Sequence, residues 1–173
     1  MEGLNLFAQI RKVDEEWRLV YGRLTQEVSD KAGECMDYDL SKPNFEKWIA
    51  DSMELSKGKG HGNMRAMHGN VCARLFPEVI LNDDEKAEDV VGRVIDDNEW
   101  EKVLAGAYPG FSVGGAYGKK WQDGDVLRYE AIPKEGSLVD RPCVLTATFF
   151  EVLKQDDTLA KELILIRTCF CVS

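Results

Sequence analysis

A serine between glycines and one of the two histidines are the residues that could do chemistry in this sequence. Ser112 stands in the segment 110–115, Gly-Phe-Ser-Val-Gly-Gly, and His68 stands in Arg-Ala-Met-His-Gly at 65–69. Serine becomes a nucleophile when a neighbouring base takes its proton, and an imidazole with a free pKa of about 6.5 suits this task. The glycines would let a substrate approach Ser112 closely. The two segments together predict nucleophilic catalysis, although a serine at a glycine-rich strand start is by itself more often structural.

A third group usually orients the imidazole and stabilises its charged form, and a carboxylate does this well. Glu135 and Asp140 bracket a predicted strand at 136–139. Because they are five residues apart, a continuous strand would point their side chains to opposite faces, and only one could face His68. The reaction would also need backbone N–H groups that stabilise a negatively charged intermediate. The candidates for this role are Gly114, Gly115, Asp140 and Arg141.

Other bases, nucleophiles and metal ligands have weaker support in the sequence. His61 could act as a second base, but its glycine-rich surroundings indicate a loop. Cys72 could rival Ser112 as the nucleophile, but its apolar neighbours indicate an inert, buried thiol. The five cysteines contain no CxxC pair and the histidines are seven residues apart, so we expect neither a disulfide framework nor a metal site. The predicted chemistry needs no cofactor.

Length and charge narrow the class of protein. The chain has 173 residues, which suits one domain, and its 22 Lys and Arg against 31 Asp and Glu give a net charge of −9. A nucleic-acid-binding protein needs a cationic face, so direct binding of DNA or RNA is not expected. No run reaches the roughly 18 apolar residues of a membrane span, and the first residues lack the pattern of a secretory signal. We therefore expect a cytosolic protein that does not enter a membrane.

The candidate site residues lie in or beside short segments that are predicted to be strands, and these segments are separated by residues typical of turns. Two helices are expected, one at 43–55 with Ser41 as its N-cap and one at 99–107 after Asp97. The predicted strands are residues 5–13, 17–28, 64–68, 71–76, 79–81, 89–95, 111–121, 127–132, 136–139 and 147–153. The pattern predicts one mainly β core with about two helices.

Four groups of residues, taken in order and spacing, carry a resemblance to a known family. These groups are Met67-His68-Gly69, residues 90–94 with Glu99-Trp100, residues 110–115 with Trp121, and residues 135–143 with Thr146-Ala147. The arrangement resembles the XkdF-type serine proteases of tailed phages and prophages. These proteins are similar to head-maturation (prohead) proteases, whose fold is similar to that of the herpesvirus assembly proteases. The resemblance extends over residues 4–154.

The resemblance implies a serine endopeptidase that cleaves scaffold or capsid proteins during prohead maturation. Ser112 would be the nucleophile, His68 the general base and then acid, and Glu135, rather than Asp140, the orienting carboxylate. Taken with the strand pattern, it implies an α+β fold whose mainly antiparallel β core is a closed or nearly closed barrel flanked by about two helices. The protein would act in the host cytoplasm within the assembling procapsid.

The resemblance also implies a division of the chain and a set of partners. Residues 1–154 would form the prohead-protease-like domain, and residues 155–173 an extension that packs on the core or forms an interface. Capsid or scaffold proteins would be the substrates, and the protein could form a homo-oligomer.

Two features depart from the family pattern. Gly136 replaces an apolar residue of the Glu-x-Ser-Leu-Val motif, which could loosen that strand. After residue 154 there is an apolar run at 163–171 in place of a long charged scaffold segment. An exposed apolar edge is typical of an assembly surface, so the alternative is a catalytically inactive, capsid-associated structural or assembly protein with a protease fold. The same run could equally be a buried element that completes the core.

Overall fold

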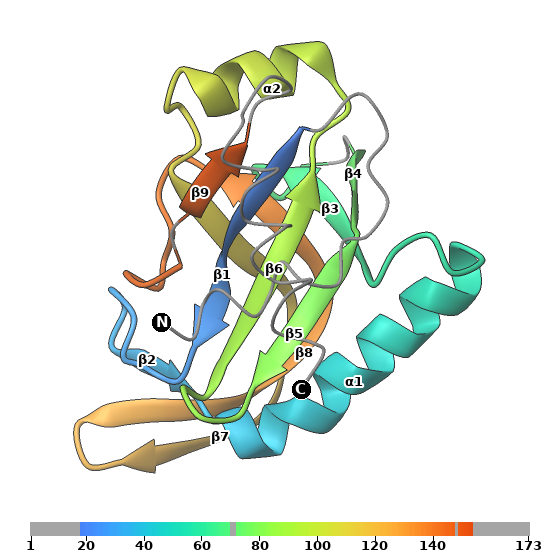
Figure 1. The fold of residues 1–173 in the computed structure, drawn as a ribbon. Coiled ribbons are helices and arrows are strands. Elements are labelled where there is room, and N and C mark those ends of the chain that lie inside the picture. Colours follow the sequence, from blue (N-terminus) through green and yellow to red (C-terminus); the bar gives the residue numbers. More distant parts are fainter. Residues whose placement is uncertain (1–17, 70–71, 148, 154–173) are drawn as a thin grey trace, which may run out of the picture.

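Two β-sheets and two helices make up the computed structural model, which describes residues 18–69, 72–147 and 149–153 (Figure 1). The elements within these ranges are β1 (Leu19–Gln26), β2 (Glu34–Met36), α1 (Tyr38–Leu55), β3 (Gly62–Ala66), β4 (Cys72–Phe76), β5 (Glu78–Asn82), β6 (Ala87–Arg93), α2 (Asp97–Leu104), β7 (Gly110–Asp123), β8 (Val126–Val139) and β9 (Phe149–Leu153). The predicted strand at 5–13 and the predicted extension at 155–173 lie outside the described residues.

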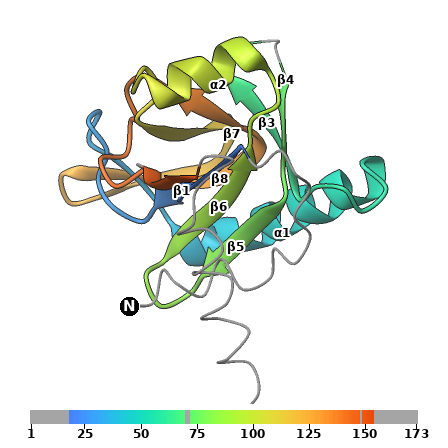
Figure 2. The ribbon, with the colours of Figure 1, turned by 45° about the horizontal axis from the view of Figure 1, so that its top comes forward.

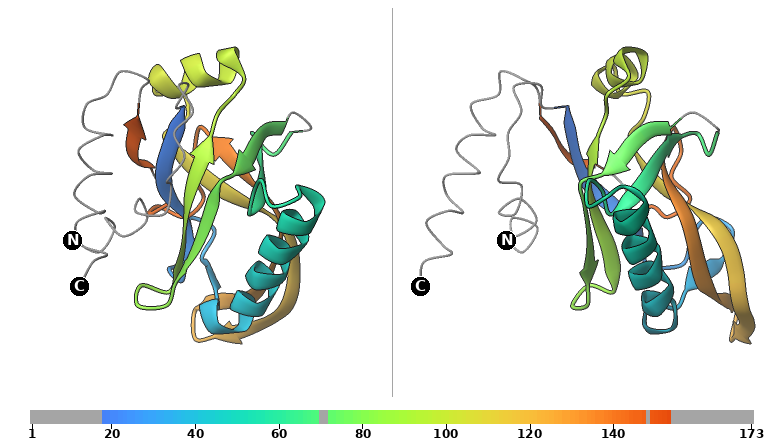
Figure 3. Two further views of the ribbon diagram at one scale, coloured as in Figure 1. Left: turned by 45° about the vertical axis from the view of Figure 1, so that its right-hand side comes forward. Right: turned by 90° about the vertical axis from the view of Figure 1, so that its right-hand side faces the viewer.

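The first sheet has the order β5-β6-β1-β9, and all of its pairs are antiparallel. The second has the order β2-β8-β3-β4, with β7 antiparallel to β8 and with β2 and β3 parallel to it. Helix α1 packs against β8 and β3, while α2 lies across one end of the sheets (Figure 2). The paired strands β7 and β8 project beyond the sheets as a long hairpin (Figure 3). The predicted α+β class, with two helices and a mainly antiparallel core, is confirmed.

The described strands do not close into a barrel, so the prediction of a closed or nearly closed barrel is met only in part. The described strands form two sheets, of which the second curves into a half-barrel. Where β7 approaches β1, the backbone N–H of Phe111 donates to the carbonyl of Ala147 at 3.2 Å.

A chain of aromatic rings fills the space between α1 and the two sheets. Phe45 contacts Trp48 edge to face at a centroid distance of 6.4 Å, Trp48 contacts Phe76 at 6.3 Å, and Phe76 contacts Phe111 at 5.7 Å. All four side chains are buried, and such pairs add to the stabilisation that area burial already gives. The chain of rings connects the first long helix to β7, the strand that carries Ser112.

Helix α1 begins at Tyr38, five residues before the predicted start, and Ser41 is not its N-cap. Asp37 is the cap, and its Oδ1 accepts the backbone N–H of Leu40 at 2.9 Å. Ser41 is buried inside the helix, where its Oγ accepts the backbone N–H of Ala131 on β8 at 2.8 Å. Serine and aspartate have similar N-cap preferences, so long-range contacts decide which of them begins the helix.

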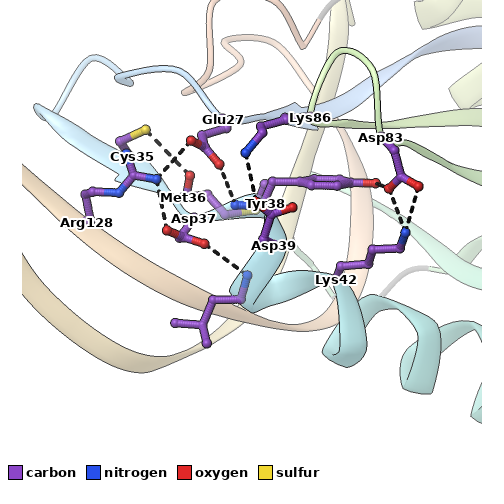
Figure 4. A network of polar contacts seen from close by, with 11 residues as sticks. Glu27, Cys35, Met36, Asp37, Tyr38, Asp39, Lys42, Asp83, Lys86 and Arg128 are labelled. Carbon is purple, nitrogen blue, oxygen red and sulfur yellow. Dashed lines mark hydrogen bonds and ion pairs between the residues drawn. The ribbon is translucent and has the colours of Figure 1, made fainter.

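Those contacts form a charged network at the N-terminus of α1 (Figure 4). Arg128 of β8 donates to Glu27 at 2.9 Å and to Asp37 at 3.0 Å, and Glu27 accepts the backbone N–H of Tyr38 at 2.8 Å. Two carboxylates therefore lie where the helix dipole favours negative charge. The Tyr38 hydroxyl donates to Asp83 at 2.8 Å, which ties the helix to the turn between β5 and β6.

Two further boundaries differ from the predictions. Helix α2 covers Asp97–Leu104, and its cap is Asp96, whose Oδ1 accepts the N–H of Glu99 at 3.0 Å. Strand β8 is continuous through Pro133, where two separate strands were predicted. Pro133 pairs with Gly115 next to a β-bulge in β8 itself, where Lys134 is the extra residue, and a bulge is one of the places where a sheet tolerates proline.

The carboxyl group of Glu88 is fully buried on the core face of β6. Its residue is 0% exposed, and neither carboxylate oxygen has a hydrogen-bond partner among the described residues. Burial, followed by the nearby charge of Asp89, raises the pKa of Glu88 well above its ordinary value. The folded protein therefore holds this proton at pH values where the unfolded chain has released it.

This difference predicts that Glu88 makes the protein less stable as pH rises above about 4.5 toward its folded-state pKa. Below about pH 4.5 Glu88 is protonated in both the folded and the unfolded chain, so it does not affect the pH dependence of stability. Between its unfolded and folded pKa values, each pH unit lowers the free energy of unfolding by about 1.4 kcal/mol. We expect the free energy of unfolding of Glu88→Gln, relative to wild type, to increase as pH rises above 4.5 in urea denaturation. The exposed Glu54→Gln variant should show no such trend, and equal pH profiles for Glu88→Gln and wild type would contradict the prediction.

Candidate active site

Strands β7 and β8 place a row of small and polar residues on one face of the second sheet. Ser112 pairs with Ser137, and Gly114 pairs with Glu135. The alternate residues of the same strands, such as Phe111 and Leu138, are buried in the core. Because side chains alternate along a strand, Ser112 and Gly114 lie on the same face as Ser137 and Glu135.

A tight turn after β3 places His68 over this row. The turn covers residues 66–69, and the N–H of Gly69 donates to the carbonyl of Ala66 at 2.9 Å. Its two central residues, Met67 and His68, have φ angles of 51° and 53°, which non-glycine residues rarely adopt. Strain of this kind costs on the order of 1 kcal/mol or more per residue and persists only where neighbouring groups hold it.

Two hydrogen bonds attach this turn to β8. The N–H of Met67 donates to the carbonyl of Leu138 at 2.8 Å, and the N–H of His68 donates to Oγ of Ser137 at 3.2 Å. On the other side of the turn, Arg65 donates to the carbonyl of Gly69 at 3.1 Å. The backbone of His68 is thereby fixed relative to the strand that carries Glu135.

The imidazole of His68 contacts Glu135 directly. Its Nδ1 lies 2.6 Å from Oε1 of Glu135, whose residue is only 8% exposed, while the His68 side chain is 42% exposed. An ionised carboxylate can only accept hydrogen bonds, so Nδ1 carries the proton, and Nε2 of the neutral ring is free to accept one. This is the tautomer that a general base requires.

Gly114 provides the space in which Glu135 and His68 meet. A Cβ atom at this position would lie 1.7 Å from Oε1 of Glu135 and 3.0 Å from Nδ1 of His68. Any side chain would therefore displace the carboxylate from the ring. The bond between the two residues depends on a glycine at 114.

Ser112 is a partly buried residue of β7 that precedes Gly114 by two positions on this face. The His68 ring lies against Gly114, and residues two apart in a strand are separated by about 7 Å. The Ser112 hydroxyl therefore lies on the same face of β7 as the ring. Ser112 also borders a cavity of about 150 Å³ that is lined by Leu24, Phe111, Val144 and Ala147, among others. Direct contact between Ser112 and His68 stays a prediction.

The remaining residues considered from the sequence have other surroundings. Asp140 and Arg141 are exposed and follow the end of β8, and Glu135 is the carboxylate that contacts His68. The N–H of Phe111 points away from β8, because it donates to Ala147. Backbone N–H groups alternate in direction along a strand, so the N–H of Gly114 points toward β8 and belongs to the hydrogen bonds between β7 and β8. Gly114 thus has a steric role, and the oxyanion role of Gly115 or of the 140–141 loop stays a prediction.

His61 lies apart from this site. It directly precedes β3, whereas His68 follows β3, and its Nδ1 lies 2.5 Å from the carbonyl of Pro77. Cys72 begins β4, but its side chain is outside the described part of the structure. Within the described ranges, no three His, Cys, Asp or Glu side chains gather into a possible metal site.

Ser137 is the residue that the sequence analysis did not single out. Its Oγ donates to Oε2 of Glu135 at 2.6 Å, in addition to accepting the N–H of His68. The spacing Glu-x-Ser was the available signal, since two residues in a strand return to the same face. Gly136 between them does not leave a gap, because a Cβ there would lie 2.6 Å from the ring of Phe76, which occupies the space.

Comparison with protein-family models, with curated proteins and with solved structures found no match to this chain.

The space at Gly114 leads to a first prediction about the site. Gly114→Ala should separate Glu135 from His68, abolish reaction at Ser112 and lower the free energy of unfolding by about 1–3 kcal/mol, as expected for overpacking. Gly118→Ala on the same strand is the matched control, because its Cβ would also crowd a glutamate carboxylate, that of Glu130, which has no part in the proposed site. Activity of Gly114→Ala within a few-fold of wild type, measured with a serine-reactive probe, would refute this role.

The choice between the two carboxylates leads to a second prediction. Glu135→Gln should lower the rate at which Ser112 reacts by up to about ten-thousand-fold, as for other triad carboxylates, because the amide cannot stabilise the charged imidazole. Asp140→Asn should react almost like wild type, since this exposed side chain lies beyond the end of β8. Equal effects of the two substitutions would show that the assignment of Glu135 is wrong.

Proposed function

We propose that the protein is a serine endopeptidase in which Ser112, His68 and Glu135 form the catalytic site. The observation that carries the proposal is the bond between His68 Nδ1 and Glu135 on the face of the sheet that also carries Ser112. Acyl-transfer enzymes typically have a histidine that is hydrogen-bonded to a buried carboxylate and lies near a serine hydroxyl.

In the proposed reaction, Oγ of Ser112 attacks the carbonyl carbon of a peptide bond while Nε2 of His68 takes its proton. Glu135 stabilises the imidazolium that forms. The carbon–nitrogen bond then breaks, the proton passes from His68 to the leaving amine, and the acyl group remains as an ester on Ser112. A water molecule, deprotonated by the same ring, hydrolyses this ester and restores the hydroxyl.

The substrates and the location follow from the sequence resemblance. We propose that the protein cleaves scaffold or capsid proteins during prohead maturation of a phage or prophage, in the host cytoplasm within the assembling procapsid. Neither α1 nor α2, the two helices of the described ranges, is long and apolar enough to cross a membrane.

One observation favours the alternative, a catalytically inactive, capsid-associated structural or assembly protein. The hairpin of β7 and β8 projects from the sheets and carries Tyr117, which is 54% exposed, and the exposed Ile132 (Figure 1). Exposed apolar side chains on a projecting hairpin are typical of an interaction surface. An active enzyme and an assembly protein can share such a surface, so activity has to separate them.

We predict that a fluorophosphonate probe labels the protein at Ser112, since this reagent reacts with hydroxyls that a neighbouring base activates. Labelling should disappear in Ser112→Ala and fall by about a hundred-fold or more in His68→Ala. Mass spectrometry of the labelled peptide identifies the site. Co-expression of the wild type or Ser112→Ala with the neighbouring capsid and scaffold proteins then tests the substrates. Fragments that are identical with both chains, together with absent labelling, would favour the inactive assembly protein.

A further inference from the structure

We propose that Ser137 is a positioning residue of this site, which holds Glu135 and the backbone of His68 in their working arrangement. The proposal rests on the proposed function for its catalytic consequence, but its geometric content can be tested without activity. Ser137 would not react with substrate, because its residue is 0% exposed and its hydroxyl is already engaged on both sides.

The first contact of Ser137 orients the carboxylate. Its Oγ donates to Oε2 of Glu135 at 2.6 Å, while the other oxygen, Oε1, faces Nδ1 of His68. Each carboxylate oxygen therefore has one donor, and the carboxylate cannot rotate away from the ring without losing a charge-assisted bond. Without the hydroxyl, Oε2 of a buried carboxylate would have no partner in this arrangement, and that loss favours rotation.

The second contact holds the strained turn. Ser137 Oγ accepts the N–H of His68, which is one of the two turn residues with positive φ. The hydroxyl thus connects the backbone of the base to the carboxylate that its own ring contacts. Three groups from β8 and the turn close a ring of hydrogen bonds, from the His68 backbone to Ser137, to Glu135 and back to the His68 imidazole.

The chain offers a matched control for the loss of a buried hydroxyl. Ser41 is also 0% exposed, and its Oγ accepts a backbone N–H, that of Ala131, at 2.8 Å. It belongs to α1 and has no part in the proposed site. Ser41→Ala therefore reports what removing a buried, hydrogen-bonded serine does to the fold alone.

The experiment compares wild type, Ser137→Ala, Ser137→Thr and Ser41→Ala. We expect the rate of fluorophosphonate labelling to fall by about 10- to 100-fold in Ser137→Ala, the size expected for a lost charged hydrogen bond. Ser137→Thr, which keeps the hydroxyl, should recover most of the rate, and Ser41→Ala should stay within about twofold of wild type. Labelling of Ser137→Ala at the wild-type rate, or an equal loss in Ser41→Ala, would overturn the proposal.

A spectroscopic readout separates this proposal from the proposed function. In protein with ¹⁵N-labelled histidine, the low-field proton resonance on Nδ1 of His68 reports its bond to Glu135. We expect it to shift or broaden in Ser137→Ala while the Nδ1 resonance of His61, which faces the carbonyl of Pro77, stays unchanged. If the wild type fails to label, the endopeptidase proposal falls and this resonance alone decides the role of Ser137. An unchanged His68 signal in Ser137→Ala would then refute it.

Discussion

The hydrogen bond between Nδ1 of His68 and Oε1 of Glu135 imposes the strictest constraint on this structure. It joins a turn after β3 to a buried carboxylate on β8, and it passes over β7 at Gly114, where a side chain would occupy the space of the bond. A shift of one residue in the pairing of β7 with β8 would turn Glu135 toward the core or place a side chain beneath the ring. Three separate segments must therefore keep their register for this single bond to form.

The core supplies that register from the opposite face of the same strands. Phe111 and Leu138 are fully buried, and Phe76 fills the space that Gly136 leaves open. Any slip would expose these side chains to solvent and bury polar ones, which costs about 2 kcal/mol or more for each large residue. A bulge at Lys134 then adjusts the course of β8 next to Pro133, which cannot donate to the ladder. Hydrophobic packing on one face thus determines which polar groups meet on the other.

Local patterns in the sequence indicated His68, the glycine-rich segment around Ser112 and two candidate carboxylates, Glu135 and Asp140, because strand alternation and glycine spacing depend on neighbouring residues alone. The choice of Glu135 came from the family resemblance. They did not identify the start of α1, since Asp37 and Ser41 are both good caps and the choice depends on Arg128, far along the chain. They also divided β8 at Pro133, because tolerance of this proline depends on a bulge at Lys134 that is defined only by the pairing with β7. Barrel closure was likewise beyond local patterns, as it depends on contacts between whole sheets.

The strain in the turn at Met67 and His68 shows how local and long-range interactions combine. A glycine or asparagine would adopt these φ angles at lower cost, yet the turn carries methionine and histidine. Hydrogen bonds from both residues to β8 and one across the turn itself offset a strain on the order of 1 kcal/mol per residue. Because the bonds to β8 exist only when it is correctly paired, His68 reaches Glu135 only in the fully assembled sheet. The position of the imidazole is therefore a property of the whole second sheet rather than of the turn.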